Sequence, residues 1–274
     1  MSADVKSCAS KLEALLGREY GPLPEVLPNT PEAKFQYGKR LYGNGPLGWL
    51  KSFVLKKYNT PGSFYVWERH VIFQGDFGDE GKSEFSLLHE LTHGYTAKRA
   101  PGLVNDNNAY LEAAKFWKPL KPAELEKALL FAYIVEGLAD YAAISIHKKE
   151  STPQDKKWGL SYENNFKTAF QSDVKELSEI NRLAWAMPYE SILDHGATIA
   201  KALWDECALP YVSKNKHGMS TEILKVLHDA KYLYGYFSMR QYLKGTPEPI
   251  GDRVDALITS PPATFAELEE RCGA

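Results

Sequence analysis

The sequence predicts an α+β protein that is mostly helical. One stretch, residues 63–76, is rich in aromatic and β-branched side chains and gives the one strong strand signal in the chain. Much of the remaining sequence repeats its apolar residues with a helical period. With 274 residues, 44% of them hydrophobic, the chain can bury a substantial core. We therefore expect a small, largely antiparallel sheet before about residue 81, followed by helices.

The N-terminal quarter is expected to supply two helical segments around an irregular connection. Residues 2–17 form an amphipathic pattern that Gly17 ends. Residues 21–31 carry four prolines, which predicts chain without regular structure. Residues 31–58 are again helical, with a break at 43–46.

The strand signal has the form of a hairpin. Residues 64–67 and 71–73 are the two strands, and His70 is expected at the surface in the turn between them. An edge strand beside a catalytic site can bind an extended peptide through its backbone. That gives the first strand a function as a substrate ledge, made by Phe64, Tyr65, Val66 and Trp67. The alternative, a sheet that only covers a helix, stays open.

The motif His89-Glu90-Leu91-Thr92-His93 carries the clearest chemical signal. Its surroundings have a helical period, so the two histidines project from one face, one turn apart. Two imidazoles placed in this way can share one Zn²⁺. Glu90 follows the first ligand directly and is placed beside the metal, where a general base must lie to accept a proton from the attacking water.

A second long helical segment is expected to complete the metal site. A catalytic zinc takes three protein ligands and keeps one open position, and Glu136 can be the third ligand. Asp140 lies one turn further on the same face and can accept the free N–H of a ligand imidazole. The neighbouring residues are largely apolar, and a carboxylate is costly to bury there unless it is paired or bound to a metal.

These two motifs resemble those of the gluzincin metallopeptidases, the thermolysin-like family with a His-Glu-x-x-His helix and a later Glu-x-x-x-Asp. The strands before the helix are also similar, so that the resemblance covers roughly a third of the chain. It implies a zincin-like fold with a helical C-terminal lobe, in which His89, His93 and Glu136 bind Zn²⁺ and Asp140 supports a ligand. The segment between His93 and Glu136 is longer than in thermolysin, which makes this a divergent member.

The resemblance also implies a donor for the oxyanion that forms during peptide hydrolysis. In the family this donor, a histidine or tyrosine, comes from a region downstream of the third ligand. His195 and Tyr189 are both candidates here, and the register does not choose between them. A core histidine beside Asp194 is the alternative interpretation of His195. His147, in the basic end of the helix that carries Glu136, is expected at the surface.

We expect one catalytic unit built from two lobes. Residues 1–110 would form an N-terminal lobe with the sheet and the His-Glu-x-x-His helix, and residues 111–274 a helical lobe with the third ligand. A net charge of −2 gives no reason to expect nucleic acid or a membrane as a partner. The three cysteines are widely spaced and match free thiols in a reducing compartment. No secretory signal is visible, so a cytoplasmic location, or export without a signal peptide, is expected.

The sequence therefore predicts a zinc metallopeptidase that acts on a peptide or protein, with an endopeptidase favoured because no amine-binding motif indicates an exopeptidase. Two alternatives stay open: a toxin or effector protease with one narrow target, and a catalytically silent zinc-binding scaffold or sensor. The oligomeric state and the cleavage-site preference are not indicated by the sequence.

Overall fold

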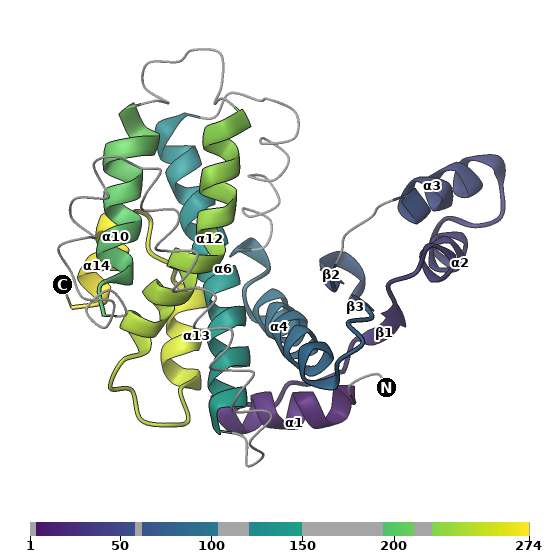
Figure 1. Cartoon of the computed structure of the whole chain (residues 1–274), viewed down its shortest axis with the longest axis horizontal. Coiled ribbons are helices and arrows are strands. Elements are labelled where there is room, and N and C mark those ends of the chain that lie inside the picture. Colours follow the sequence, from purple (N-terminus) through teal and green to yellow (C-terminus); the bar gives the residue numbers. More distant parts are fainter. Residues whose placement is uncertain (1–3, 58–61, 104–120, 150–193, 211–220, 274) are drawn as a thin grey trace.

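The computed structural model describes residues 4–57, 62–103, 121–149, 194–210 and 221–273. A body of helices occupies one side of the molecule and a helical hairpin projects from the other, with a small sheet between them (Figure 1). This arrangement agrees with the expected α+β, mostly helical class. The expected lobe boundary at residue 110 lies outside the described residues.

Helix α6 is the central element of the body. Its 28 residues are apolar around almost the whole circumference, which is typical of a helix buried on all sides. It is long and apolar enough to cross a membrane, and 89% of its most apolar window is buried inside the protein. The body consists of α1 (Val5–Leu16), α4 (Glu80–Arg99), α6 (Pro122–Lys149), α10 (Gly196–Leu203), a short π-helix (Trp204–Ala208), α12 (Thr221–Leu243), α13 (Gly251–Thr259) and α14 (Phe265–Arg271).

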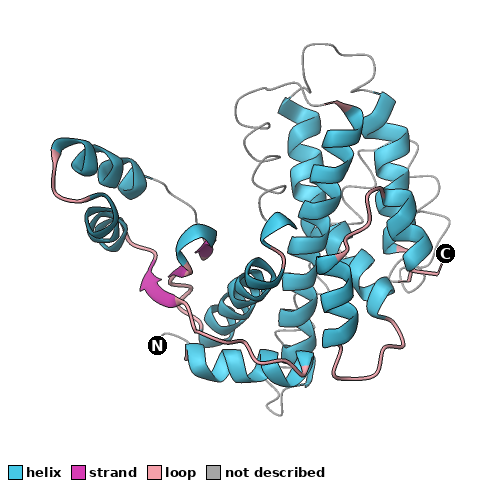
Figure 2. Ribbon diagram, turned by 180° about the vertical axis from the view of Figure 1, so that it is seen from behind, coloured by secondary structure: helices cyan, strands magenta, loops and turns pink. Residues whose placement is uncertain are grey.

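Helices α4 and α12 both pack along α6, and the shorter helices close the body around them (Figure 2). The crossing of α6 and α12 is tight because glycine faces glycine. A Cβ added at Gly137 would lie 2.2 Å from the carbonyl oxygen of Gly235, and one added at Gly235 would lie 2.5 Å from the carbonyl oxygen of Tyr133. The absence of both side chains lets the two backbones touch, which fixes the register of α12 against α6.

The sheet has three strands, β1 (Glu25–Pro28), β2 (Phe64–Val66) and β3 (Val71–Gln74), in the order β1-β3-β2. A 3₁₀ turn (Trp67–Arg69) joins β2 to β3, and these two strands pair antiparallel as predicted. The expectation of a largely antiparallel sheet holds for this pair alone, because β1 pairs parallel to β3 and makes the sheet mixed.

Strand β1 comes from the proline-rich stretch that was expected to lack regular structure. Its prolines do not prevent pairing, since Pro28 is the last residue of an edge strand, where a missing N–H is tolerated. The chain continues the ladder on both sides: Glu25 N–H donates to the His70 carbonyl, and Asn29 N–H to the Gln74 carbonyl.

His70, expected at the surface, is half-buried. It stabilises the turn by donating a hydrogen bond from Nε2 to the Pro22 carbonyl.

The projecting unit, residues 31–57, is called the hairpin arm below. It consists of α2 (Pro31–Tyr42) and α3 (Pro46–Lys57), with the break at 43–46 where the sequence predicted one. Its inner face packs on the sheet in a small core of its own, separate from the main core. This second core contains Tyr37, Val71 and Phe73, with Leu27, Leu41, Leu55, Phe64 and Val66 packed around them.

Helix α1 is present and ends at Gly17, whose φ of 63° is left-handed, so this prediction is confirmed. The surface position of His147 is wrong, because the residue is fully buried and its ring packs 5.7 Å from that of Phe85. His147 lies two turns beyond Asp140 on the face of α6 that α4 covers, and the burial of this face continues to the end of the helix.

The glycine crossing leads to a stability prediction. Gly137→Ala forces the α6 and α12 backbones apart, and we expect a cost of about 1–3 kcal/mol in the free energy of unfolding, as for other overpacked interiors. Gly102→Ala is the matched control, because a Cβ at Gly102 meets nothing within 4 Å. Urea denaturation of both variants measures the difference. Equal stability of the two variants would show that the crossing is not tight.

Candidate metal centre

Helix α4 brings the two histidines of the motif to one face. Its start is fixed by Asp79, whose side chain accepts the backbone N–H of Lys82 at 2.9 Å. With the helix begun there, His89 and His93 are one turn apart and their rings meet edge to face, 4.6 Å between centroids. The helix is buried along most of its length, so these polar rings lie inside the protein rather than on its surface.

Helix α6 brings Glu136 and Asp140 to the same place from the other side. Both residues are buried, at 8% and 5% exposure, in a helix that is largely apolar. The spacing of four residues puts them one turn apart on the face that packs against α4. Two buried carboxylates are thereby held opposite two imidazoles.

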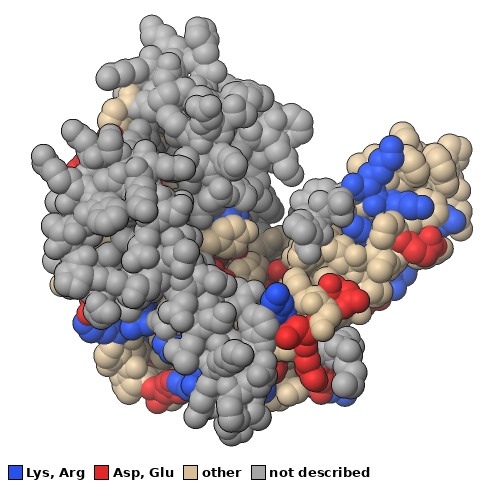
Figure 3. Space-filling view, viewed as in Figure 1, with Lys and Arg blue, Asp and Glu red and all other residues tan. Residues whose placement is uncertain are grey.

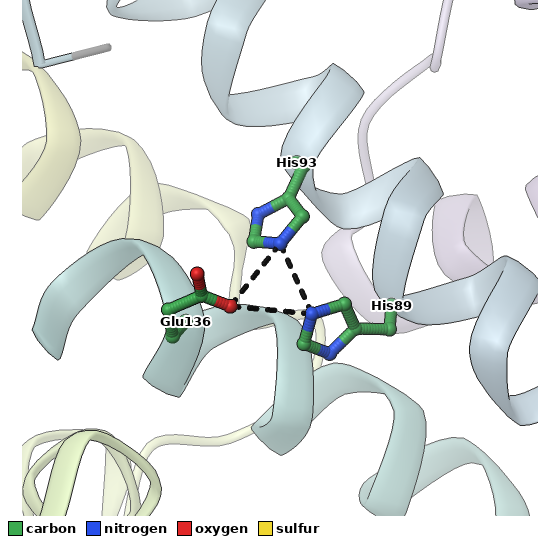
Figure 4. A group of neighbouring side chains, drawn as sticks. All are labelled: His89, His93 and Glu136. Atoms are coloured by element: carbon green, nitrogen blue, oxygen red, sulfur yellow. Dashed lines mark hydrogen bonds and ion pairs between the residues drawn. The ribbon is translucent and has the colours of Figure 1, made fainter. Parts of the chain in front are cut away.

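Three donor atoms from these helices converge on one point (Figure 4). The Nε2 atoms of His89 and His93 are 3.0 Å apart, and Glu136 Oε2 lies 3.3 Å from the first and 3.4 Å from the second. Among the described residues this is the group of histidine, cysteine and acidic side chains with the spacing to hold a metal ion.

The donor set fits a metal on chemical and geometric grounds. Four tetrahedral ligands at about 2.0–2.1 Å from an ion lie about 3.3–3.4 Å from one another, which is close to the three separations observed. Nδ1 of His93 is buried and has no hydrogen-bond partner among the described residues. Nε2 is therefore the nitrogen of this ring that meets the other two donors. Two histidines and one glutamate can therefore hold a metal ion here.

Asp140 orients one of the two imidazoles. Its Oδ1 lies 2.8 Å from His89 Nδ1, where a carboxylate accepts the N–H of the ring. That hydrogen bond places the proton on Nδ1 and leaves the Nε2 lone pair directed at the convergence point. This is the contact that the sequence pattern predicts.

The charges of the site are strongly coupled. Burial disfavours the charged form of His89, but Asp140, together with Glu136 and Glu90, holds its pKa well above the ordinary value. Burial likewise opposes the ionised form of Glu136, yet Lys231 and the two histidines hold the pKa of this carboxyl well below its usual range. Without a metal, the cluster therefore keeps an imidazolium and a carboxylate side by side.

Glu90 lies in the same buried environment but has a different partner. Its pKa is raised, with burial as the largest cause, although both histidines act in the opposite direction. The backbone N–H of Tyr65 in β2 donates to its carboxylate. Glu90 is thus anchored to the edge strand and is a stronger base than an exposed glutamate, which suits proton transfer near neutral pH.

Lys231 is a residue of the site that the sequence analysis missed. Its Nζ lies 3.0 Å from Glu136 Oε1, and both side chains are buried. The crossing of Gly137 and Gly235 explains this contact, since Lys231 lies one turn before Gly235 on α12 and Glu136 is adjacent to Gly137. The available signal was a lysine within the tyrosine-rich stripe of α12, at a position with the period of its buried residues.

The proposed substrate ledge lies against the metal centre. Strand β2 is an edge strand of the sheet and packs on α4. Trp67, which follows it, places its ring 5.4 Å from that of His93. Phe64 and Val66 face the second core instead, and Tyr65 is buried. The four residues of the ledge are therefore divided between the site and the packing of the sheet.

The two candidate oxyanion donors are not brought to the cluster in the described part of the chain. His195 precedes α10 and lines a separate pocket near the C-terminus, together with Gln241, Arg253 and Cys272. Gly196, next to it, packs on the backbone of Phe237, two turns along α12 from Lys231. Tyr189 lies outside the described residues.

Comparison of the chain with models of protein families, with curated proteins and with solved structures found no match. The class of site is therefore defined by its own geometry: a buried cluster of two histidines and a glutamate that can hold a metal ion.

The buried ion pair leads to a prediction about Lys231. Lys231→Met removes the buried lysine partner of Glu136 and leaves the histidines alone beside this carboxylate, and we expect the metal-free protein to lose about 3–5 kcal/mol of stability. Added zinc should recover part of this loss, because it also neutralises Glu136. The control is Lys201→Met, which removes an exposed pair with Asp205 and should cost at most about 1 kcal/mol. Thermal unfolding with and without zinc measures both effects, and equal losses in the two variants would contradict the account.

The raised pKa of His89 leads to a prediction about pH. The metal-free protein keeps this ring protonated at neutral pH, so a metal must displace the proton, and zinc affinity should rise by about tenfold per pH unit for each proton released. The same ring stabilises the metal-free fold below its ordinary pKa, and this contribution is lost as the pH rises through the raised value. Competition titrations at several pH values, with proton release measured in weak buffer, test this.

Asp140→Asn is the matched variant, since it is isosteric and removes the main group that raises the pKa of His89. It should release fewer protons when zinc binds. Zinc binding without proton release by the wild-type protein would show that His89 is not a ligand.

Proposed function

We propose that the chain is a zinc-dependent metallopeptidase of the gluzincin type, which hydrolyses peptide bonds without a covalent intermediate. The convergence of His89 Nε2, His93 Nε2 and Glu136 Oε2 is the observation that carries the proposal. Asp140 behind one ligand and Glu90 beside it supply the supporting carboxylate and the candidate general base of such a reaction.

The donor chemistry favours zinc, although a pair of histidines with one carboxylate also occurs in iron enzymes. The separations among the three donors match a tetrahedral ion, and three protein ligands leave one position for water or substrate. A buried carboxyl with a raised pKa next to the ligands suits hydrolysis, because this chemistry needs a proton acceptor. An iron enzyme that activates oxygen has no corresponding need for Glu90.

Each side chain has a distinct part in the proposed reaction. Zinc, when bound, would lower the pKa of water and polarise the scissile carbonyl. Glu90 accepts the proton of the attacking water and passes it to the leaving amine. Asp140 fixes the tautomer of His89, and Lys231 holds the second oxygen of Glu136 so that one oxygen is presented to the metal.

Lys231 also changes the charge of the centre. With Glu136 paired to a lysine, the three ligands and their nearest cation carry no net negative charge, which keeps the metal a strong acceptor of electrons.

The oxyanion donor stays a prediction, with His195 and Tyr189 as the candidates from the sequence.

The substrate we propose is a peptide or protein bound in extended form along β2, next to the base. This strand is at the edge of the sheet, and Glu90 is hydrogen-bonded to its backbone at Tyr65. A peptide added to this edge would pass the base directly. Cleavage within a chain, rather than at its end, remains the favoured mode.

The two roles of ligand and base are separated by a pair of substitutions. Glu136→Ala should lower the zinc content of the purified protein well below one per chain, with loss of cleavage as a consequence. Glu90→Gln should keep one zinc per chain and lose cleavage by about 10²-fold or more, since general base catalysis contributes on this order. Metal analysis by mass spectrometry, with casein and a peptide library as substrates, measures both quantities.

Each remaining outcome has a definite meaning. A full complement of zinc with no cleavage by the wild-type protein would favour a zinc-binding scaffold or a protease with one narrow target, and cleavage of general substrates would be excluded. Iron in place of zinc would overturn the choice of metal. Equal activity of the wild type and Glu90→Gln would overturn the role of Glu90.

A further inference from the structure

The hairpin arm carries an apolar surface that the fold does not use. Its inner face is buried in the second core, so the packing that holds the arm in place is complete without its outer face. Six large hydrophobic side chains are exposed among the described residues, and five of them lie on the arm: Tyr42, Leu47, Trp49, Leu50 and Val54. Exposed apolar residues gathered on one unit, rather than scattered, mark an interaction surface.

These side chains have the spacing of one helix face. Leu47, Leu50 and Val54 lie three and four residues apart on α3 and are 66%, 53% and 64% exposed. Trp49 is half exposed beside them and stacks on Phe53, with ring centroids 5.4 Å apart. Tyr42 and Leu47 are at the tip of the hairpin, which extends away from the body (Figure 1). The surface is therefore open to a large partner.

The charge of the arm is opposite to that of the rest of the chain. Residues 31–57 contain six lysines and arginines and one glutamate, a net charge of +5, whereas the whole chain has −2 and the remainder therefore −7. Helix α3 has three lysines and no acidic residue. Lys and Arg side chains are visible over the arm in the space-filling view (Figure 3).

The lysines are placed as they are in helices that lie on a lipid surface. Nζ of Lys51 lies 5.3 Å from the ring centre of Tyr42, and Nζ of Lys57 lies 4.7 Å from the ring centre of Phe53. The two ammonium groups therefore lie over aromatic rings of the arm, with their aliphatic stems beside the apolar side chains. An apolar stripe of leucine and tryptophan with lysines at its edge is typical of interfacial amphipathic helices.

We propose that the hairpin arm binds the surface of an anionic lipid bilayer. In this arrangement α3 lies in the interface, with Leu47, Leu50 and Val54 at the boundary of the acyl chains and Lys51 and Lys57 at the level of the phosphates. The proposal is independent of the metal centre and of the function proposed for it.

Two other partners fit the surface less well. A second copy of the chain would bring two arms of charge +5 together if the same surface paired with itself, and this repulsion opposes a dimer. Protein interfaces are enriched in arginine and depleted in lysine, whereas α3 has lysine alone as its charged residue. The net charge of the whole chain, −2, gave no reason to expect a membrane as a partner. The local charge of the arm, +5, favours an anionic membrane surface.

The test is co-sedimentation of the full chain with vesicles of phosphatidylcholine alone and of phosphatidylcholine mixed with phosphatidylserine. We expect binding to the anionic vesicles, weakened by salt. Lys51→Glu with Lys57→Glu should reduce the partition coefficient about tenfold or more, because each lysine near such a surface contributes severalfold. Leu50→Ser with Val54→Ser, which leaves the charge unchanged, should reduce it by a similar factor.

Lys6→Glu with Lys121→Glu is the matched control for charge. Both lysines are exposed, both lie outside the arm, and the net change is the same as in the arm variant. This control should bind like the wild type, and all variants should keep the far-ultraviolet circular dichroism of the folded protein. Wild-type protein that ignores anionic vesicles, or an arm variant that binds as well as the wild type, would overturn the proposal. A dimer in solution that Leu50→Ser with Val54→Ser abolishes would also overturn it, in favour of a second copy as the partner.

Discussion

The compensation of buried charge at Glu136 is the interaction on which the rest of the site depends. Helix α6 is largely apolar and buried, and an unpaired carboxylate within it would cost several kcal/mol. The structure surrounds this carboxylate with His89 and His93 on one side and Lys231 on the other. Compensation of this charge therefore requires α4 and α12 to meet α6 at the same level.

The glycine crossing is the means by which this requirement is met. A lysine on α12 can reach Glu136 only if the two helix backbones come close, and the contact between Gly137 and Gly235 brings them together. On the other side, Asp140 binds His89 and fixes α4 one turn along. The packing of α4, α6 and α12 thus brings His89, His93 and Glu136 together as a group that can hold a metal ion. Such a site is held in place by rigid elements, which favours precise coordination.

Much of this arrangement was predictable from the sequence, and the failures have physical reasons. Helical spacing predicted that His89 and His93 share one face, because such a pair is a local feature of the chain. Glu136 was predicted from its apolar surroundings and the need for a third ligand, and the structure brings the three together. The contact with Lys231 was not predictable in this way, since it joins residues that are 95 positions apart through a crossing of two helices. The parallel pairing of β1 was missed because Pro24 and Pro28 predicted irregular chain, and the three residues between them are too few for a strand signal. The surface position of His147 failed because a basic helix end was weighed more heavily than the buried face it continues.

The central claim is that the two histidines and the glutamate hold a zinc ion, and X-ray absorption spectroscopy at the zinc edge tests it most directly. The account predicts a first shell of nitrogen and oxygen atoms at about 2.0–2.1 Å, with the multiple scattering of two imidazole rings and no sulfur. In Glu136→Ala this shell should lose one light atom or the metal altogether. A shell that contains sulfur, an octahedral shell of oxygen atoms without imidazole, or a folded protein that binds no zinc would contradict the account.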